Sequence, residues 1–93
     1  MIPASDIEYL GSTPLDYPRA SQRLKEAGTV TLRVLIDERG VPASVLVAKS
    51  SGFQRLDDAA ISSVKKWRFK PYIENAQPTS GWALIPVIFE LEK

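Results

Sequence analysis

The sequence predicts an α+β domain: a three-stranded antiparallel sheet in the order 2-1-3, with a longer helix packed on one face and a short N-terminal helix. Three observations lead to this class. Alternating runs over 29–37 and 41–47 flank a glycine-containing turn, apolar residues recur every three or four positions over 53–67, and a third alternating run covers 82–91. A chain of 93 residues, 44% of them hydrophobic, suffices for one small core.

Residues 1–16 contain Pro, Gly, Ser and Thr without a period, so we expect an extended or mobile lead-in before a domain over 17–93. Within the lead-in, residues 7–10 are the candidate for pairing with the free edge of the sheet. Pro18 suits the first turn of a helix, where its missing N–H removes a donor that has no partner. Ala20, Leu24 and Ala27 would form the apolar stripe of this helix, and Gly28 would end it.

The two strands 29–37 and 41–47 form a predicted hairpin in which Gly40 takes the positive φ of the turn. The final strand, 82–91, contains Pro86, which cannot donate to a central ladder and therefore belongs at an edge, beside 29–37. The expected inward side chains of the three strands are Val30, Leu32, Val34 and Ile36; Val41, Ala43, Val45 and Val47; and Ile85, Val87, Phe89 and Leu91.

The longer helix is predicted from an apolar side made of Phe53, Leu56, Ala60, Val64 and Trp67. Acidic residues near its start and basic residues near its end agree with the helix dipole, and a proline at 71 prevents continuation. We expect Trp67 to pack against Phe53, Val64 and the sheet. Residues 73–81 are predicted to be a loop.

Composition argues against an enzyme. The chain has no His and no Cys, so the usual general base and the commonest metal ligands are missing, and no cofactor or metal is expected. Asp57 and Asp58 are adjacent on a helix, and their side chains diverge by about 100°. We interpret them as charges that stabilise the helix start.

Residues 65–72 interleave four cations with three aromatic residues, a composition found in surfaces that stack single-stranded nucleic acid. Trp67, however, falls on the apolar side of the helix, and the cations suit its C-terminal end. A net charge of +1 also gives little attraction for phosphates. We therefore expect no nucleic acid partner, and keep this as the third alternative.

The final strand also carries large apolar residues on the face opposite to its inward set, at Trp82, Leu84 and Ile88. Either the first helix or residues 7–10 cover them, or they form an interaction surface. An uncovered apolar edge also invites association of two copies, so a homodimer through the edge strand is possible.

In order along the chain, several motifs resemble the C-terminal domain of the TonB family over about residues 14–92. They are Tyr17-Pro18, the 28–30 and 37–40 segments of the hairpin, 50–52, Leu56-Asp57, Ala60, the run WRFKP at 67–71 and the closing run 85–91. The resemblance implies a periplasmic domain of an energy transducer that is not an enzyme. Its partners would be outer-membrane TonB-dependent transporters, bound at their N-terminal box peptide and plug, and an inner-membrane ExbB-ExbD-like complex that supplies force from the proton-motive force for uptake of siderophores, haem or vitamins.

The resemblance also implies where a transporter peptide would bind: to the edge of the last strand, beside the Tyr-Pro motif. The residues that it points to are Tyr17, Pro18, Arg19, Gln22, Trp82, Leu84, Pro86, Ile88 and Glu90. Some family members carry Gln ahead of the motif and Arg two positions after it, whereas this chain has Pro14, Leu15 and Asp16, and then Arg19 followed by Ala20. A TolA-like or other periplasmic envelope module is the alternative.

No run of about 18 apolar residues occurs in this sequence. Proteins of the resembled family carry an N-terminal membrane helix and a proline-rich spacer ahead of this domain. We therefore expect this chain to be a fragment of a periplasmic protein that is anchored to the inner membrane in its full-length form.

Overall fold

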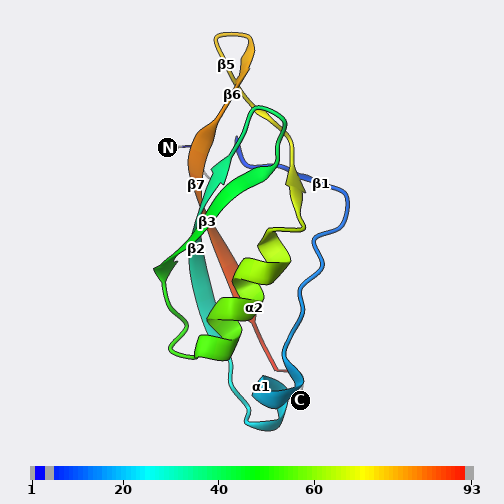
Figure 1. Ribbon diagram of the computed structural model, residues 1–93, viewed down its shortest axis with the longest axis vertical. Helices are drawn as coiled ribbons and strands as arrows, with labels where there is room; N and C mark the ends of the chain where they lie inside the picture. Colours follow the sequence, from blue (N-terminus) through cyan, green and yellow to red (C-terminus); the bar gives the residue numbers. More distant parts are fainter. Residues whose placement is uncertain (1, 4–5, 92–93) are drawn as a thin grey trace.

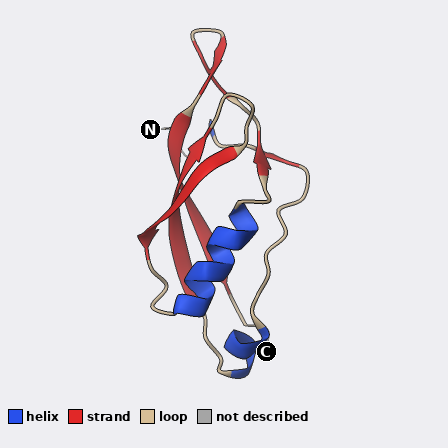
Figure 2. Ribbon diagram, viewed as in Figure 1, coloured by secondary structure: helices blue, strands red, loops and turns tan. Residues whose placement is uncertain are grey.

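The computed structural model describes residues 2–3 and 6–91 and has at its centre a three-stranded antiparallel sheet. Its strands are β2 (Gly28–Ile36), β3 (Pro42–Lys49) and β7 (Gly81–Phe89), in the order β3-β2-β7. Helix α2 (Gln54–Val64) lies across one face of the sheet (Figures 1 and 2). This confirms the predicted fold class and places the proline-containing strand β7 at an edge.

The core lies between α2 and the sheet, and strict alternation on β2 and β7 supplies most of it. Its buried apolar side chains are Ile2, Val30, Leu32, Val34, Ile36, Leu56, Ala60, Val64, Trp67, Phe69, Ala83, Ile85, Val87 and Phe89. Strand β3 contributes less than predicted, because Ala43 and Val47 are exposed. A register shift beside Ile36 sets Pro42 opposite that residue, which ends the simple alternation of β3.

The turn between β2 and β3 needs a glycine at position 40. Gly40 has φ of +81°, and a Cβ atom there would lie 1.8 Å from the carbonyl oxygen of Phe69. The Asp37 carboxylate accepts hydrogen bonds from the backbone N–H groups of Arg39 and Val41, both at 2.9 Å. The positive φ predicted for Gly40 is thus confirmed, and the close approach of Phe69 adds a second reason for glycine.

Helix α2 ends at Val64, one turn earlier than the apolar spacing predicted. Arg68–Phe69 form the short strand β4 instead, and the N–H of Phe69 donates to the carbonyl of Gly40 at 2.9 Å. Trp67 is buried in the turn between α2 and β4, whereas Phe53 precedes α2 and is 36% exposed. The predicted contact between Trp67 and Phe53 is therefore wrong, because the whole helix separates them.

Asp57 faces the loop that enters α2 and is almost fully buried, whereas Asp58 is exposed. The Asp57 carboxylate accepts hydrogen bonds from the Ser50 hydroxyl, the Ser51 N–H at 3.0 Å and the Ser51 hydroxyl at 2.8 Å. Burial alone would raise the pKa of the Asp57 carboxyl, but these hydrogen bonds outweigh it and hold the pKa below its ordinary value. Asp57 therefore fixes the loop between β3 and α2.

Asp57→Asn should lower the free energy of unfolding by about 1–3 kcal/mol near neutral pH, because a charged acceptor is lost. The stabilisation exists above the ordinary pKa of an aspartate and disappears as pH falls through the lower pKa of the folded state. Urea unfolding of the wild type and the variant at neutral and strongly acidic pH should show a difference that vanishes in acid. Asp58→Asn is the matched control and should have little effect at either pH; equal effects of the two substitutions would contradict this role of Asp57.

The lead-in packs on the domain through strand β1 (Tyr9–Leu10), which pairs with β4. The ring of Tyr9 meets that of Trp67 edge-on, with centroids 5.7 Å apart, and the indole N–H of Trp67 donates to the carbonyl of Pro14 at 2.8 Å. The prediction that residues 7–10 pair with the free edge of the sheet is wrong, because β4 offers them a strand beside two aromatic rings.

Helix α1 (Arg19–Arg23) is shorter than predicted and lies at the end of the molecule opposite a hairpin of strands β5 (Tyr72–Glu74) and β6 (Gln77–Thr79) (Figure 1). Lys25 has a φ of +57°, which ends the helix before Ala27, and Gly28 begins β2. The expected apolar stripe of Ala20, Leu24 and Ala27 is exposed, so that prediction is wrong. The side that faces inward is instead marked by Ser21, which is fully buried.

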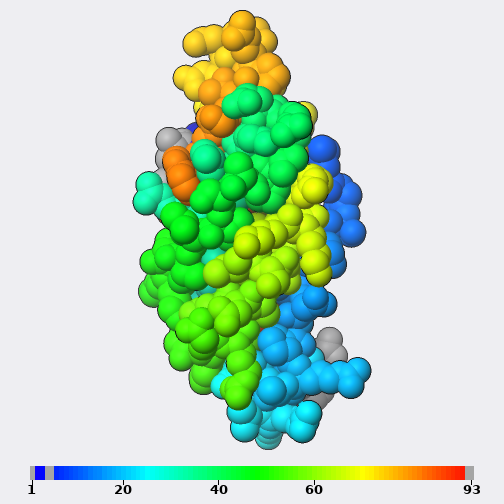
Figure 3. Space-filling view, in the orientation of Figure 1, coloured from blue at the N-terminus to red at the C-terminus, as the bar shows by residue number. Residues whose placement is uncertain are grey.

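Residues 73–81, predicted to be a loop, contain most of a small hairpin of β5 (Tyr72–Glu74) and β6 (Gln77–Thr79). Asn75 and Ala76 have φ of +53° and +63°, the signs of a tight type I′ turn. Alanine is uncommon at the second of these positions, and Pro78 argues against a strand, so this hairpin has no clear signal in the sequence. The hairpin projects from one end of the molecule (Figure 3).

Candidate functional site

The outer edge of β7 is the principal candidate site. Strand β7 pairs with β2 on one side, and the described residues place no further strand on its other side. The carbonyl of Trp82 points to this outer side, because it accepts a hydrogen bond from the N–H of Ile2 at 2.7 Å. Backbone direction alternates along an antiparallel strand, so Leu84, Pro86 and Ile88 also turn their backbone groups outward.

Pro86 interrupts the outer row of donors. It lies opposite Thr31 of β2, and its missing N–H would have pointed away from that strand. The outer edge from Leu84 to Ile88 therefore offers three carbonyl groups but only two N–H groups. An added strand can pair fully at the two ends of this stretch and only as a donor at its centre.

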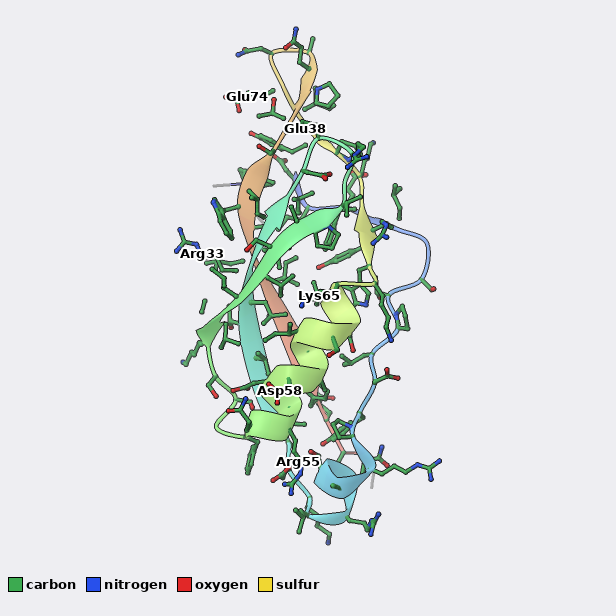
Figure 4. All side chains as sticks on the ribbon, in the orientation of Figure 1. Arg33, Glu38, Arg55, Asp58, Lys65 and Glu74 are labelled. Carbon is green, nitrogen blue, oxygen red and sulfur yellow. The ribbon has the colours of Figure 1, made fainter. Side chains whose placement is uncertain are left out.

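The sheet face opposite α2 is apolar along this edge. Leu84 and Ile88 are 43% and 55% exposed, so neither α1 nor residues 7–10 cover them. Trp82 is half-buried, and the guanidinium of Arg33 lies 5.1 Å from its ring centroid. Arg33 projects outward from the sheet (Figure 4). The side chains of Leu84 and Ile88 are thus available to an added strand, whereas the ring of Trp82 already contacts Arg33.

A cleft adjoins the C-terminal end of this edge. It has two connected parts, which share Tyr17, Glu90 and Leu91, and it is completed by Leu15, Gln22 and Ile88. The ring of Tyr17 packs edge-on against Phe89, the last residue of β7, with centroids 5.2 Å apart. Tyr17 therefore joins the cleft to the end of the strand.

The Tyr17-Pro18 motif is held in place by α1. The backbone N–H of Gln22 donates to the carbonyl of Pro18 at 3.0 Å, and its side-chain amide donates to the carbonyl of Tyr17 at 3.0 Å. Pro18 precedes the helix with extended backbone, and Arg19, the first helical residue, is exposed. This arrangement fixes the tyrosine ring while leaving the arginine side chain at the surface.

The structure thus brings together five of the residues that the sequence singled out: Tyr17, Pro18, Gln22, Ile88 and Glu90. Leu84 and Pro86 continue along the same edge, whereas Trp82 lies at the far end of β7, beside Ile2. The sequence reasoning missed Leu15 and Leu91 as cleft residues and Ile2 as the residue bonded to Trp82. Leu15 is an isolated apolar residue in an irregular segment, and such a residue carries no periodic signal.

The run 65–72 does not form the stacking surface that its composition suggested. Trp67 and Phe69 are buried in the core. Lys66 and Lys70 pair with Asp16 and Glu8 at 3.8 and 3.4 Å, and the Arg68 guanidinium donates to the carbonyl of Trp67 at 2.8 Å. The aromatic residues Trp67 and Phe69 are thus core, as predicted, whereas the expected place of the cations at the helix end is wrong, because α2 stops at Val64 and has no basic residue in its last turn.

Among residues 2–3 and 6–91, no helix has the length and apolar character needed to cross a bilayer.

Comparison with known proteins shows the family of this chain. Residues 13–91 match the family model of the Gram-negative bacterial TonB protein C-terminal. The chain is 37% identical to protein tonB2 of Pseudomonas aeruginosa, covering 96% of this chain and 33% of that protein, and 33% identical to protein TonB of Vibrio cholerae, covering 82% and 31%. It is also similar to the solution NMR structure of the Pseudomonas aeruginosa TonB CTD, with a TM-score of 0.78, 28% identity, and coverage of 96% and 90%.

The chain spans about a third of the length of these two curated relatives. The family is not one of enzymes. The match covers the Tyr17-Pro18 motif, the three-stranded sheet and the edge strand β7 together. This chain therefore belongs to the family of Gram-negative bacterial TonB C-terminal domains.

Proposed function

We propose that this chain is the periplasmic C-terminal domain of a TonB-like energy transducer, and that it binds the N-terminal box peptide of outer-membrane TonB-dependent transporters by adding it as a strand to β7. In this proposal residues 17–93 form the binding domain, preceded by the lead-in of residues 1–16. The full-length protein would be anchored in the inner membrane, where an ExbB-ExbD-like complex would supply the force for uptake of siderophores, haem or vitamins.

The observation that carries the proposal is the outer edge of β7 beside the Tyr17 cleft. An extended peptide gains main-chain hydrogen bonds from such an edge, and pockets for its alternate side chains give selectivity. Here the exposed Leu84 and Ile88 flank the edge on one face, and Tyr17, Gln22 and Glu90 line the cleft at its end. Arg19 lies at the surface of the same region.

The edge also limits how a peptide can lie on it. The Trp82 carbonyl is engaged by Ile2, and Pro86 lacks a donor, so the available stretch is short. A carbonyl group of the bound peptide therefore has no donor at Pro86. It must either lie opposite another residue or accept a hydrogen bond from water. Affinity should be moderate, because a small interface must offset the ordering of a flexible peptide.

Fluorescence anisotropy with a labelled N-terminal segment of a TonB-dependent transporter tests this proposal. The segment should bind, and the same segment with alternate residues N-methylated should lose most of its affinity, since N-methylation removes the donors needed for strand pairing. Equal binding of both peptides would contradict strand addition. Light scattering during the titration identifies a homodimer formed through the edge, which the peptide should dissociate.

A TolA-like or other envelope module remains the second candidate, because an exposed sheet edge serves either role. Capture of outer-membrane proteins on this domain separates the two. Transporters with an exposed N-terminal segment should bind if the TonB-like proposal is correct. Lipoproteins or colicin-like proteins in their place would support the alternative. Nucleic acid is not among the proposed partners.

A further inference from the structure

Glu26, between α1 and β2, contacts three residues at this end of the molecule: Tyr17, Ser21 and Arg55. Its carboxylate accepts a hydrogen bond from the Ser21 hydroxyl at 2.7 Å and pairs with the Arg55 guanidinium at 3.3 Å. Its backbone carbonyl accepts a hydrogen bond from the Tyr17 hydroxyl, and its N–H donates to the carbonyl of Ser21 at 2.8 Å. Both the side chain and the backbone of Glu26 therefore make polar contacts.

Helix α1 depends on these polar contacts. It has five residues, too few for a stable isolated helix, and both its apolar residue Ala20 and its C-cap residue Leu24 are exposed. Ser21, which faces inward, is fully buried and has the Glu26 carboxylate as its acceptor. The side chain of Glu26 is only 12% exposed, whereas that of Arg55 is 52% exposed.

Arg55 links this cluster to the rigid part of the fold. It lies in the first turn of α2, beside α1 (Figure 4), and α2 packs on the sheet through Leu56 and Ala60. Contacts thus run from α2 through Arg55 and Glu26 to the hydroxyl of Tyr17, whose ring lies against Phe89 at the end of β7.

We propose that Glu26 is a positioning residue for the cleft at the end of β7. It holds Tyr17 and α1 in place relative to the end of β7, so that the cleft is already formed before a strand is added. This inference rests on the proposed function of β7. Preorganisation raises affinity by removing the ordering cost from the binding step. Glu26 itself need not touch the bound peptide.

The test reverses the charge at Arg55 and then removes the charge of its partner Glu26. The Arg55 side chain is exposed enough for its substitution to leave the fold intact. Arg55→Glu places a like charge beside Glu26 and should weaken binding of the labelled transporter segment by about tenfold, roughly 1.4 kcal/mol. The loss should shrink at high salt, because the repulsion is partly screened. Adding Glu26→Gln to Arg55→Glu removes the repulsion and should restore most of the affinity.

Two further measurements keep the outcome unambiguous. Glu38→Gln, in the β2–β3 turn far from the cleft, is the control for a lost carboxylate and should bind like the wild type (Figure 4). NMR signals of the Tyr17 and Phe89 rings, recorded without peptide, should shift in Arg55→Glu and return in the double variant. Unchanged ring signals, or a loss of affinity that Glu26→Gln does not restore, would overturn the positioning role. If the wild type binds no peptide, the proposed function fails, and the ring signals still decide the role of Glu26.

Discussion

Replacing Trp67 by alanine should lower the free energy of unfolding by about 3–5 kcal/mol, because a large aromatic side chain is removed from the core. That is a large part of the total stability of a small domain. Trp67 is 7% exposed, its ring meets Tyr9 edge-on, and its indole N–H donates to Pro14. The variant should therefore unfold the domain or lower its melting temperature sharply, as circular dichroism would show.

Trp67→Phe separates the two contributions of this residue. It keeps most of the apolar volume but loses the hydrogen bond that ties the lead-in to the core, so an intermediate melting temperature is expected. Ile73→Ala, at a position that is 52% exposed, is the control and should change melting little. Wild-type melting of Trp67→Ala would contradict the core role of this side chain.

Ile88→Pro should weaken binding of the transporter segment by about tenfold or more while melting changes little. The N–H of Ile88 points away from β2, so its loss removes a donor from the outer edge and none from the ladder. Pro86, two residues earlier, shows that this strand accepts proline at an outward position. Anisotropy and thermal unfolding of the same variant measure the two effects.

Two control variants separate the loss of the outward N–H from other effects of the substitution. Ile88→Ala keeps the N–H and removes the exposed side chain, so it reports the apolar contribution alone. Val87→Pro removes an N–H that points to Val30 of β2 and should destabilise the domain itself. If Ile88→Pro and the wild type bind the segment equally, the outer edge of β7 is not the site.

Regular periodicity made the sheet predictable. Val30, Leu32, Val34 and Ile36 alternate over a complete strand, and Pro86 alone was enough to place the last strand at an edge. The same reasoning failed where tertiary contacts outweigh local pattern. Trp67 continues the helical spacing of the sequence, but α2 ends at Val64, and pairing with Tyr9–Leu10 and with Gly40 makes residues 68–69 a strand.

The candidate site was predictable only in part. Tyr17 and Gln22 precede β7 by some sixty residues in the sequence, and the motif alone indicated that they lie near it. Glu26, Arg55 and Ile2 had no such signal, because their roles depend on contacts between segments that are distant in sequence. Ser21 was assigned to no apolar pattern, although it is the residue of α1 that is most deeply buried.

Amide hydrogen exchange with and without the transporter segment tests the central claim most directly. If the segment adds as a strand to β7, exchange at the outward N–H groups of Leu84 and Ile88 should slow, and chemical shifts should change along residues 83–91. Signals from Tyr17 and Gln22 should shift with them, while residues 65–72 stay unchanged. Perturbation of residues 65–72 with no effect on β7 would contradict the account.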